Sequence, residues 1–223
     1  MNVIVISLER AKERRERIKS QFEKLGIDGI IMDAVDGEKL SNIQKNKHIN
    51  NPEGMFRNGE KFLPGEVGCL MSTINAINMA RQKNWEYVII MDDDVILSED
   101  FKKGVNFLFR MVPPDWQHIF LGGHIYLAPA PVFQPSIVQS YFKISGSYCY
   151  ILNKSAYNIV LNDLLRFELP VDDAFEKIYL KDQKIKSYIF FPFLAYPIQE
   201  HSYIWNTEGG QIHPSFKYFK NKL

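Results

Sequence analysis

The chain has 223 residues, of which 46% are apolar and 24% are charged, and its formal net charge is +1. This composition is typical of an ordinary globular protein, and the length predicts one domain over residues 1–223 with an irregular segment from about 194 onward. The small net charge excludes a general nucleic-acid binder, because no basic excess is available to neutralise phosphates.

Two cysteines, Cys69 and Cys149, form neither a disulfide framework nor a zinc ligand set, which favours a reducing compartment. The apolar start at 1–6 is too short for a signal sequence, and no apolar run approaches the roughly 18 residues of a membrane span. We therefore expect a cytoplasmic protein with at most peripheral contact at the inner membrane face. The tail 216–223 interleaves aromatics with lysines and is either such a contact or a frayed terminus.

The first third of the chain alternates strand and helix. An apolar strand at 3–6 precedes a helix from Glu9 to Leu25, whose apolar residues recur at helical spacing and which Gly26 ends as its C′ residue. A strand at 29–32 then enters a turn at 33–37. Strand, helix and strand with short joints predict a parallel βαβ unit.

The middle of the chain contains a long polar excursion at 38–63, which we expect to be a functional loop or lid. After Pro64-Gly65 a second amphipathic helix is expected to run to about Lys83, followed by a buried strand at 87–91 and a third helix starting near Ser98. This continues the α/β alternation.

The C-terminal half is more broken, with prolines at 129, 131 and 135. Its expected elements are a strand at 116–121 ending in Gly122-Gly123-His124, one or two strands over 138–152 interrupted at Gly146, a helix at 155–165, a short helix after Pro170, and a last strand at 188–193. No internal repeat or composition break divides the chain. The order predicts one α/β domain.

Three carboxylates, Asp92, Asp93 and Asp94, directly follow the buried strand at 87–91. Adjacent anions cost free energy unless a cation shares the site. In an extended chain Asp92 and Asp94 point to one side and Asp93 to the other, so the first and third could hold one ion together. The alternative is a solvated loop start in which Asp94 holds a turn.

Four polar clusters are expected beyond the carboxyl ends of strands, where open parallel sheets bind ligands. They are Ser7 to Arg14, Asp33 to Gly37, Asp92 to Asp94, and Gly122 to His124. A ligand touching all four would be nucleotide-sized, yet the chain has neither a Gly-x-Gly-x-x-Gly fingerprint nor a Walker A sequence. A sugar nucleotide with Mn²⁺ or Mg²⁺ fits this inventory better, because oxygen-rich carboxylates suit these cations.

The chain resembles glycosyltransferase family 25, the lipooligosaccharide and collagen β-galactosyltransferase group. The resemblance rests on blocks that occur in order along nearly the whole chain. They are Val5-Ile6-Ser7-Leu8-Glu9-Arg10 with the pair Arg14-Arg15, Asp33-Ala34-Val35-Asp36-Gly37, Leu63-Pro64-Gly65-Glu66-Val67-Gly68-Cys69, Ile90-Met91-Asp92-Asp93-Asp94-Val95, Gly146-Ser147-Tyr148-Cys149-Tyr150-Ile151-Leu152, Pro170-Val171-Asp172, Phe191-Pro192 and Ser202-Tyr203-Ile204.

Two positions depart from the family pattern. The family has a Ser-His pair after Gly-Cys where this chain has Ser72-Thr73, so the role of that imidazole is absent. The family's first acid in the acidic block is commonly Glu, and here it is Asp92, which remains a good ligand for a hard cation.

The resemblance implies an α/β fold of the GT-A type, with a Rossmann-like mixed sheet flanked by helices. It also implies a UDP-sugar donor such as UDP-galactose, a Mn²⁺ or Mg²⁺ ion, a glycan or protein acceptor, and inversion at the anomeric carbon. Asp94 is then the principal metal ligand, and Asp92 serves the metal or the ribose.

Each of the remaining candidate residues has either a functional role or a purely structural one, and the sequence leaves both open. Asp172 or Asp173 is the candidate catalytic base, or both are acids at a helix start. Glu66 is a catalytic candidate or a first-turn acid, and His201, like His124, is a metal or phosphate ligand or a structural histidine. The candidate donor-binding residues are Ser7, Leu8, Arg10, Arg14, Asp36, Asp92 and Asp93. Of these, Arg10 and Arg14 are alternatively solvent-facing helix residues.

Two rival functions remain. A haloacid-dehalogenase-type phosphotransferase also carries Asp-x-Asp at a strand end, although normally on the first strand of its core. A degenerate transferase would bind a nucleotide sugar without turnover, and Thr73 favours that alternative. The sequence leaves the acceptor, the transferred sugar and the oligomeric state open.

Overall fold

The computed structural model describes residues 1–41, 43–44, 62–125 and 136–198. Its helices are α1 (Lys12–Leu25), α3 (Pro64–Gln82), α4 (Phe101–Met111), α5 (Lys154–Leu164) and α6 (Val171–Glu176), with short helical turns η1 (Gly37–Lys39) and η3 (Lys177–Lys181). Its strands are β1 (Val3–Ser7), β2 (Ile30–Asp33), β3 (Tyr87–Asp92), β4 (Val95–Leu97), β5 (His118–Ile125), β6 (Ser136–Gln139), β7 (Ile144–Asn153), β8 (Ser187–Phe191) and β9 (Ala195–Pro197).

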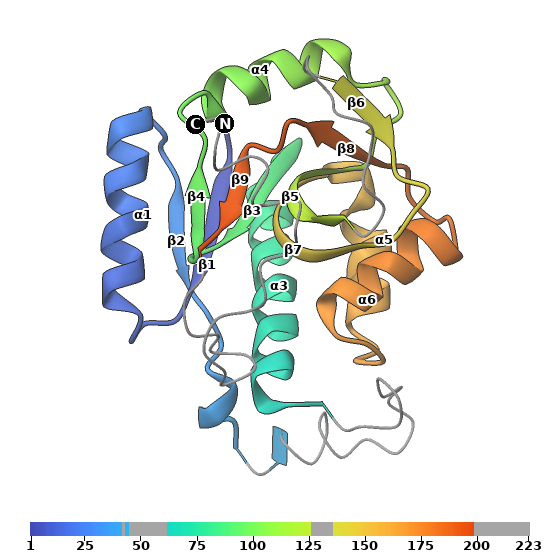
Figure 1. The fold of residues 1–223 in the computed structure, drawn as a ribbon. Coiled ribbons are helices and arrows are strands. Elements are labelled where there is room, and N and C mark those ends of the chain that lie inside the picture. The colour runs from blue at the N-terminus through green and yellow to red at the C-terminus, as the bar shows by residue number, and fades with distance from the viewer. Residues whose placement is uncertain (42, 45–61, 126–135, 199–223) are drawn as a thin grey trace.

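The central sheet has seven strands in the order β2-β1-β3-β7-β5-β8-β6. β1 pairs in parallel with β2 and β3, so the predicted βαβ unit is confirmed. β7 runs antiparallel to both of its neighbours, β3 and β5, which makes the sheet mixed. A separate antiparallel pair, β4 with β9, lies beside it (Figure 1).

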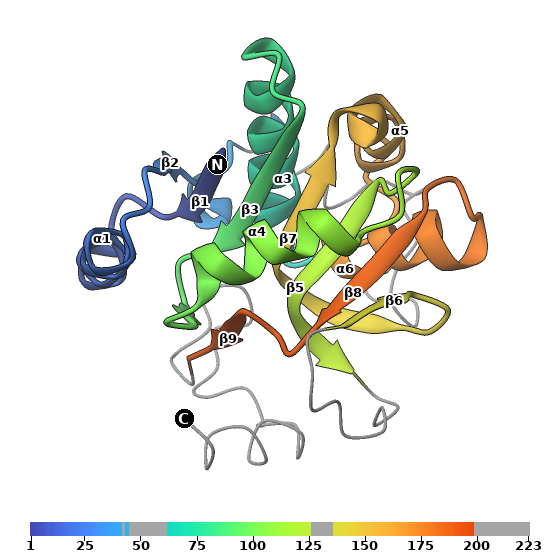
Figure 2. The ribbon, with the colours of Figure 1, turned by 90° about the horizontal axis from the view of Figure 1, so that it is seen from above.

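Helices cover both faces of the sheet (Figures 1 and 2). α3, α5 and α6 pack on one face and α1 and α4 on the other. Strand β3 supplies both layers by alternation, since Val88 and Ile90 belong to the core on the α3 side and Ile89 and Met91 to the core on the α1 side. The expected α/β fold, with a mixed sheet flanked by helices, is confirmed.

Local signals predicted several element ends well. Gly26 ends α1 in the left-handed conformation, with φ of 61°. α3 begins at Pro64, two residues before the expected start after Pro64-Gly65, because a proline's missing N–H costs nothing in a first helical turn. Among the described residues, no helix is long and apolar enough to span a bilayer.

Other expectations were wrong. Gly122-Gly123-His124 does not follow a strand but lies within β5, at an irregularity in its pairing with β7. The break between β6 and β7 falls at 140–143, whereas Gly146 lies inside β7 with φ of 67°. β4 was not expected, and β9 forms inside the segment that was expected to be irregular. The two short strands pair with each other across a large distance in sequence, so the local sequence does not reveal either of them. The expected lid at 38–63 and the tail lie largely outside the described residues.

Candidate functional site

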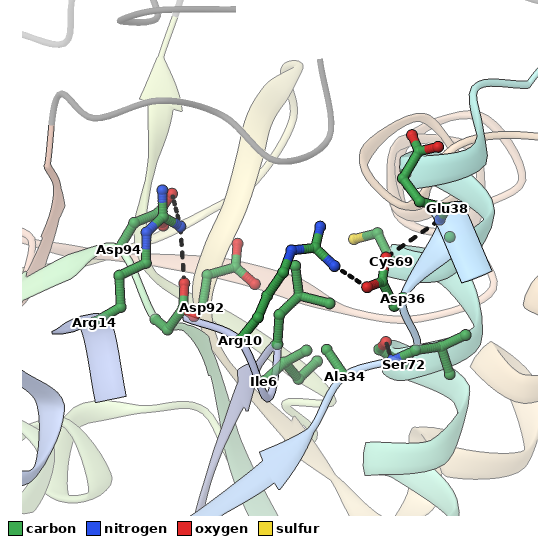
Figure 3. A pocket seen from close by; sticks show the side chains of 15 residues that line it. Ile6, Arg10, Arg14, Ala34, Asp36, Glu38, Cys69, Ser72, Asp92 and Asp94 are labelled. Atoms are coloured by element: carbon green, nitrogen blue, oxygen red, sulfur yellow. Dashed lines mark hydrogen bonds and ion pairs between the residues drawn. The ribbon is translucent and has the colours of Figure 1, made fainter. Parts of the chain in front are cut away.

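A pocket opens beyond the carboxyl ends of β1, β2 and β3, with one wall from the start of α3 (Figure 3). Seven of the predicted site residues line it: Leu8, Arg10, Arg14, Asp36, Asp92, Asp93 and Asp94. Apolar and small side chains complete the lining, among them Ile6, Ala34 and Val35. The structure therefore brings together three of the four expected polar clusters, and Gly122 to His124 do not line this pocket.

Asp93 is anchored on the α1 side of the sheet. Its carboxylate accepts a hydrogen bond of 2.6 Å from the Ser7 hydroxyl and one of 2.9 Å from Nη1 of Arg14. Asp93 as a whole residue is 6% exposed. Asp93 thus points away from Asp92, as strand alternation predicts, and it fixes the arginine of α1 against the end of β3.

Arg14 also reaches Asp94, at 3.4 Å from Nη1 to Oδ2 (Figure 3). β3 ends at Asp92, and Asp93 and Asp94 form a turn into β4. The expectation that the chain stays extended through Asp94 was therefore wrong, since the turn places Asp94 beside the guanidinium that Asp93 holds. One arginine is shared between two carboxylates.

The pKa of the Asp92 carboxyl group is strongly perturbed in the pocket. Burial raises the pKa of its carboxyl group well above the ordinary value, and the charges of Asp94, Asp93 and Asp172 raise it further, while Arg14 opposes them. The three adjacent acids carry more negative charge than Arg14 neutralises. The site is therefore suited to an additional cation.

The acids of the pocket fit a divalent metal as a partial ligand set. Among the described residues, no group of three His, Cys, Asp or Glu side chains converges to form a complete metal site. Mg²⁺ and Mn²⁺ in nucleotide sites are commonly held by one or two carboxylates, with substrate phosphates and water completing the shell. Asp92 and Asp94 match that requirement, whereas His201 lies outside the described residues.

Arg10 and Asp36 form an ion pair at the pocket rim (Figure 3). Asp36 also accepts a hydrogen bond from the backbone N–H of Glu38, at 3.2 Å, and so caps η1. The Arg10 side chain is 41% exposed, so its guanidinium remains accessible to a ligand.

The wall between β2 and α3 depends on close backbone contact. A Cβ added at Gly37 would overlap the carbonyl oxygen of Pro64, and one at Gly68 would lie 2.6 Å from that of Val35. The Ser72 hydroxyl joins the same segments, because it accepts a hydrogen bond from the Val35 N–H and donates one to the Gly68 carbonyl. Thr73, at the family's His position, is buried and does not line the pocket.

Glu66 has a local structural role. Its Oε2 accepts a hydrogen bond of 2.9 Å from the backbone N–H of Leu63, one turn earlier, which stabilises the start of α3. The interpretation as a first-turn acid is therefore confirmed. Glu66 does not line the pocket, and a catalytic role for it stays a prediction.

Asp172 and Asp173 lie in the first turn of α6 but face different partners. The two carboxylate oxygens of Asp172 accept hydrogen bonds from the backbone N–H groups of Gly146, at 2.8 Å, and Ser147, at 2.9 Å. Asp173 instead pairs with Lys143 at 3.3 Å. Neither acid is among the residues that line the pocket, but the charge of Asp172 raises the pKa of Asp92 and of Cys69, which do line it.

Two residues of the site, Cys69 and Tyr150, were not among the site residues predicted from the sequence. Cys69 lines the pocket, and burial followed by the charges of Asp92 and Asp172 raises the pKa of its thiol. Tyr150 lies behind it on β7, and its hydroxyl is close enough to Asp92 and Cys69 for both to raise its pKa. Neither position carries a local signal, because a small apolar cysteine and a packed tyrosine look the same in a sequence. His124 packs edge-on against Tyr148, with ring centroids 5.6 Å apart.

Residues 1–175 match the sequence model of glycosyltransferase family 25, described as an LPS biosynthesis protein. The chain belongs to this family. It is 26% identical to procollagen galactosyltransferase 2 of Mus musculus over 94% of this chain and 37% of that protein. It is 31% identical to probable inactive glycosyltransferase 25 family member 3 of Bos taurus, over 77% of this chain and 30% of that protein. The chain thus spans only about a third of the length of these relatives.

Among solved structures, the chain is similar to a glycosyltransferase involved in the glycosylation of the major capsid of PBCV-1. That similarity has a TM-score of 0.49 and 12% sequence identity, over 84% of this chain and 79% of that chain.

Proposed function

We propose that this chain is an inverting, metal-dependent glycosyltransferase that transfers a hexose, with galactose as the first candidate, from a UDP-sugar to a hydroxyl group. The observation that carries the proposal is the pocket at the carboxyl ends of β1 to β3, where Arg10 and Arg14 meet the acidic turn at Asp92 to Asp94. Membership of family 25 and the relatives named procollagen galactosyltransferase support it.

The donor diphosphate would lie between the two arginines and the acidic turn. Arg14 is held by Asp93, so its guanidinium is already positioned when the ligand arrives, and the geometry costs no ordering on binding. Arg10 approaches from the rim. Ile6, Ala34 and Val35, which line the pocket, would supply an apolar surface for the uracil ring, and Asp36 would accept a hydrogen bond from ribose.

Asp92 and Asp94 would hold the cation together with diphosphate oxygens. A bound Mn²⁺ or Mg²⁺ supplies positive charge that stabilises the departing UDP. On the protein side, Arg14 provides a further fixed positive charge at the same point, while Asp93 keeps it there. Asp93 would therefore hold Arg14 in position, and Asp94 would bind the cation.

Asp172 is our candidate for the catalytic base. The backbone N–H groups of Gly146 and Ser147 orient its carboxylate, and each oxygen keeps a second lone pair that can accept a proton. The acceptor oxygen would bond to the anomeric carbon as the bond from that carbon to the diphosphate breaks, and the acceptor's proton would pass to Asp172. Asp173, paired with Lys143, is less suited to this role.

The acceptor is a glycan of the lipooligosaccharide type or a protein hydroxyl. The family description supports the glycan acceptor, and the procollagen galactosyltransferase relatives support the protein acceptor. A second candidate function is nucleotide-sugar binding without turnover, which the similarity to a probable inactive family member favours. The dehalogenase alternative loses its main support, because β1 ends in Ser7 and the acidic pair follows β3.

The test is a panel of nucleotide sugars, each with and without Mn²⁺, in which the melting temperature and the release of free UDP are both followed. A transferase gives stabilisation by UDP-sugars and slow Mn²⁺-dependent release of UDP. Stabilisation without any release, even when glycan or peptide acceptors are added, would favour the non-catalytic alternative. If no UDP-sugar raised the melting temperature and none released UDP, the proposal would be contradicted.

A further inference from the structure

Tyr150 lies at the centre of β7, and its side chain belongs to the core on the α3 side of the sheet. It is 2% exposed, and its ring packs against Phe175 at 5.1 Å and His118 at 5.4 Å between centroids. These contacts involve the ring alone, so a phenylalanine would satisfy them equally well.

The hydroxyl of Tyr150 is buried and has no hydrogen-bond partner within the described part of the chain. A buried hydroxyl without a partner destabilises the folded protein, and native proteins tolerate few such groups. The other buried tyrosines of this core, Tyr157 and Tyr179, do not share the feature, because their hydroxyls donate to the carbonyls of Trp85 and Phe142, each at 3.2 Å. The Tyr150 hydroxyl therefore needs an explanation other than packing.

Strand register places the Tyr150 side chain on the same face of the sheet as Asp92. Tyr150 pairs with Ile90 of β3, and Asp92 is the next residue of β3 on the same face. Two residues of a strand span about 6.6 Å, which is close to the reach of a tyrosine side chain. After burial, the charge of Asp92 is the largest cause that raises the pKa of Tyr150, followed by the charges of Cys69, Asp172 and Cys149. The phenol thus faces the back of the acidic site.

We propose that Tyr150 is a positioning residue for Asp92, and that its hydroxyl donates a hydrogen bond to the Asp92 carboxylate when that carboxylate binds a divalent cation. The proposal rests on the metal-dependent function proposed above. It requires the Asp92 side chain or the phenol to turn toward the other, since the two are not hydrogen-bonded in this structure.

The chemistry of the pair suits this arrangement. A carboxylate has two oxygens, so one can bind a cation while the other accepts a hydrogen bond from behind. Such a hydrogen bond to an ionised acceptor is stronger than one between neutral groups and fixes the ligand's orientation. The expected consequence of losing a hydrogen bond of this kind is roughly a 10- to 100-fold loss of metal affinity.

The test compares Tyr150→Phe with the wild type, using Tyr157→Phe as the matched control. Mn²⁺ is titrated into each protein and free Mn²⁺ is followed by electron paramagnetic resonance, so the readout does not depend on turnover. The melting temperature in EDTA reports any purely structural effect. We expect Tyr150→Phe to weaken Mn²⁺ binding about tenfold, with an EDTA melting temperature equal to or above that of the wild type.

Tyr157→Phe is expected to bind Mn²⁺ as the wild type does. Wild-type affinity in Tyr150→Phe would overturn the assignment of Tyr150 while leaving the proposed function intact. A lower EDTA melting temperature accompanying the weaker binding would also overturn it, because the hydroxyl would then serve the fold. Absence of Mn²⁺ binding by the wild type would overturn the metal dependence itself, and the role of Tyr150 with it.

Discussion

Arg14 and Asp93 form a buried ion pair under the proposed donor site, with 2.9 Å between Nη1 and Oδ1 and side chains only 9% and 8% exposed. The pair joins α1 to the end of β3. A buried charge left without its partner is far more costly than the intact pair is stabilising.

Removal of one partner should therefore destabilise the protein strongly. We expect Arg14→Ala to lower the free energy of unfolding by about 3 kcal/mol, measured by urea denaturation, because Asp93 stays buried without its cation. The double variant Arg14→Met/Asp93→Asn should recover much of that loss. Lys19→Ala, which breaks an exposed pair with Glu16, is the control and should change little. A double variant as unstable as Arg14→Ala would contradict this account of the pair.

Asp92 should lower stability at neutral pH. The pKa of Asp92 is raised in the folded protein, so the native protein keeps a proton that the unfolded chain releases. The stability that this proton contributes is fully present below the unfolded pKa. It is lost as pH rises through the folded pKa. Asp92→Asn should therefore be more stable than the wild type in EDTA at pH 7, and the difference should shrink toward about pH 4. The measurement is the free energy of unfolding across this range. Equal pH slopes for the two proteins would be inconsistent with the raised pKa.

His118 predicts an acid-sensitive core. Burial lowers its pKa from 6.5 to about 3, and its ring is stacked on Phe175 at 5.1 Å. Below pH 6.5 the unfolded chain gains a proton that the native protein does not, so stability is lost as pH falls from 6.5 toward 3. The wild type should lose about 2 kcal/mol from this group between roughly pH 6.5 and pH 5.

Replacement of the imidazole tests that assignment. His118→Phe should lack this part of the pH dependence, whereas Ser187→Ala, which removes the hydroxyl 2.8 Å from Nδ1, should keep it. Urea denaturation at several pH values measures both. If His118→Phe showed the same acid slope as the wild type, another group would be responsible.

Substitution of Gly37 tests whether the contact between η1 and α3 shapes the donor site. A Cβ there would overlap the Pro64 carbonyl, which forces η1 away from α3. We expect Gly37→Ala to cost about 1–3 kcal/mol of stability and to abolish UDP binding measured by calorimetry. Gly104→Ala, on α4, meets the Leu194 side chain instead and should leave UDP binding unchanged. Retained UDP binding by Gly37→Ala would show that this wall does not shape the donor site.

Local chemistry made part of this fold predictable. The helix stop at Gly26, the helix that follows the Leu63-Pro64-Gly65 segment and the buried strand leading into Asp92 each follow from residues adjacent in sequence. The structure has all three, with α3 beginning at Pro64, two residues earlier than expected. Because parallel strands bind ligands at their carboxyl ends, the strand pattern also predicted that Arg10, Asp36 and Asp92 share one pocket, as they do.

Partners distant in sequence could not be predicted in this way. β4 is three residues long and depends on β9, about a hundred residues later. The turn at Asp93 and Asp94 depends on an arginine of α1, and the Asp172 carboxylate on backbone N–H groups of β7. Alternation along β3 gave the direction of Asp93 correctly, but nothing in the local sequence identified Arg14 as its partner.

The central claim is that the acidic turn binds a cation and a uridine diphosphate together, and calorimetric titration of UDP in the presence and absence of Mn²⁺ tests it most directly. The wild type should bind UDP much more tightly with Mn²⁺ than in EDTA. Asp94→Ala should lose that difference while keeping the weak Mn²⁺-independent binding that Arg10 and Arg14 provide. Unchanged Mn²⁺-dependent UDP binding in Asp94→Ala, or no binding of UDP by the wild type, would contradict the account.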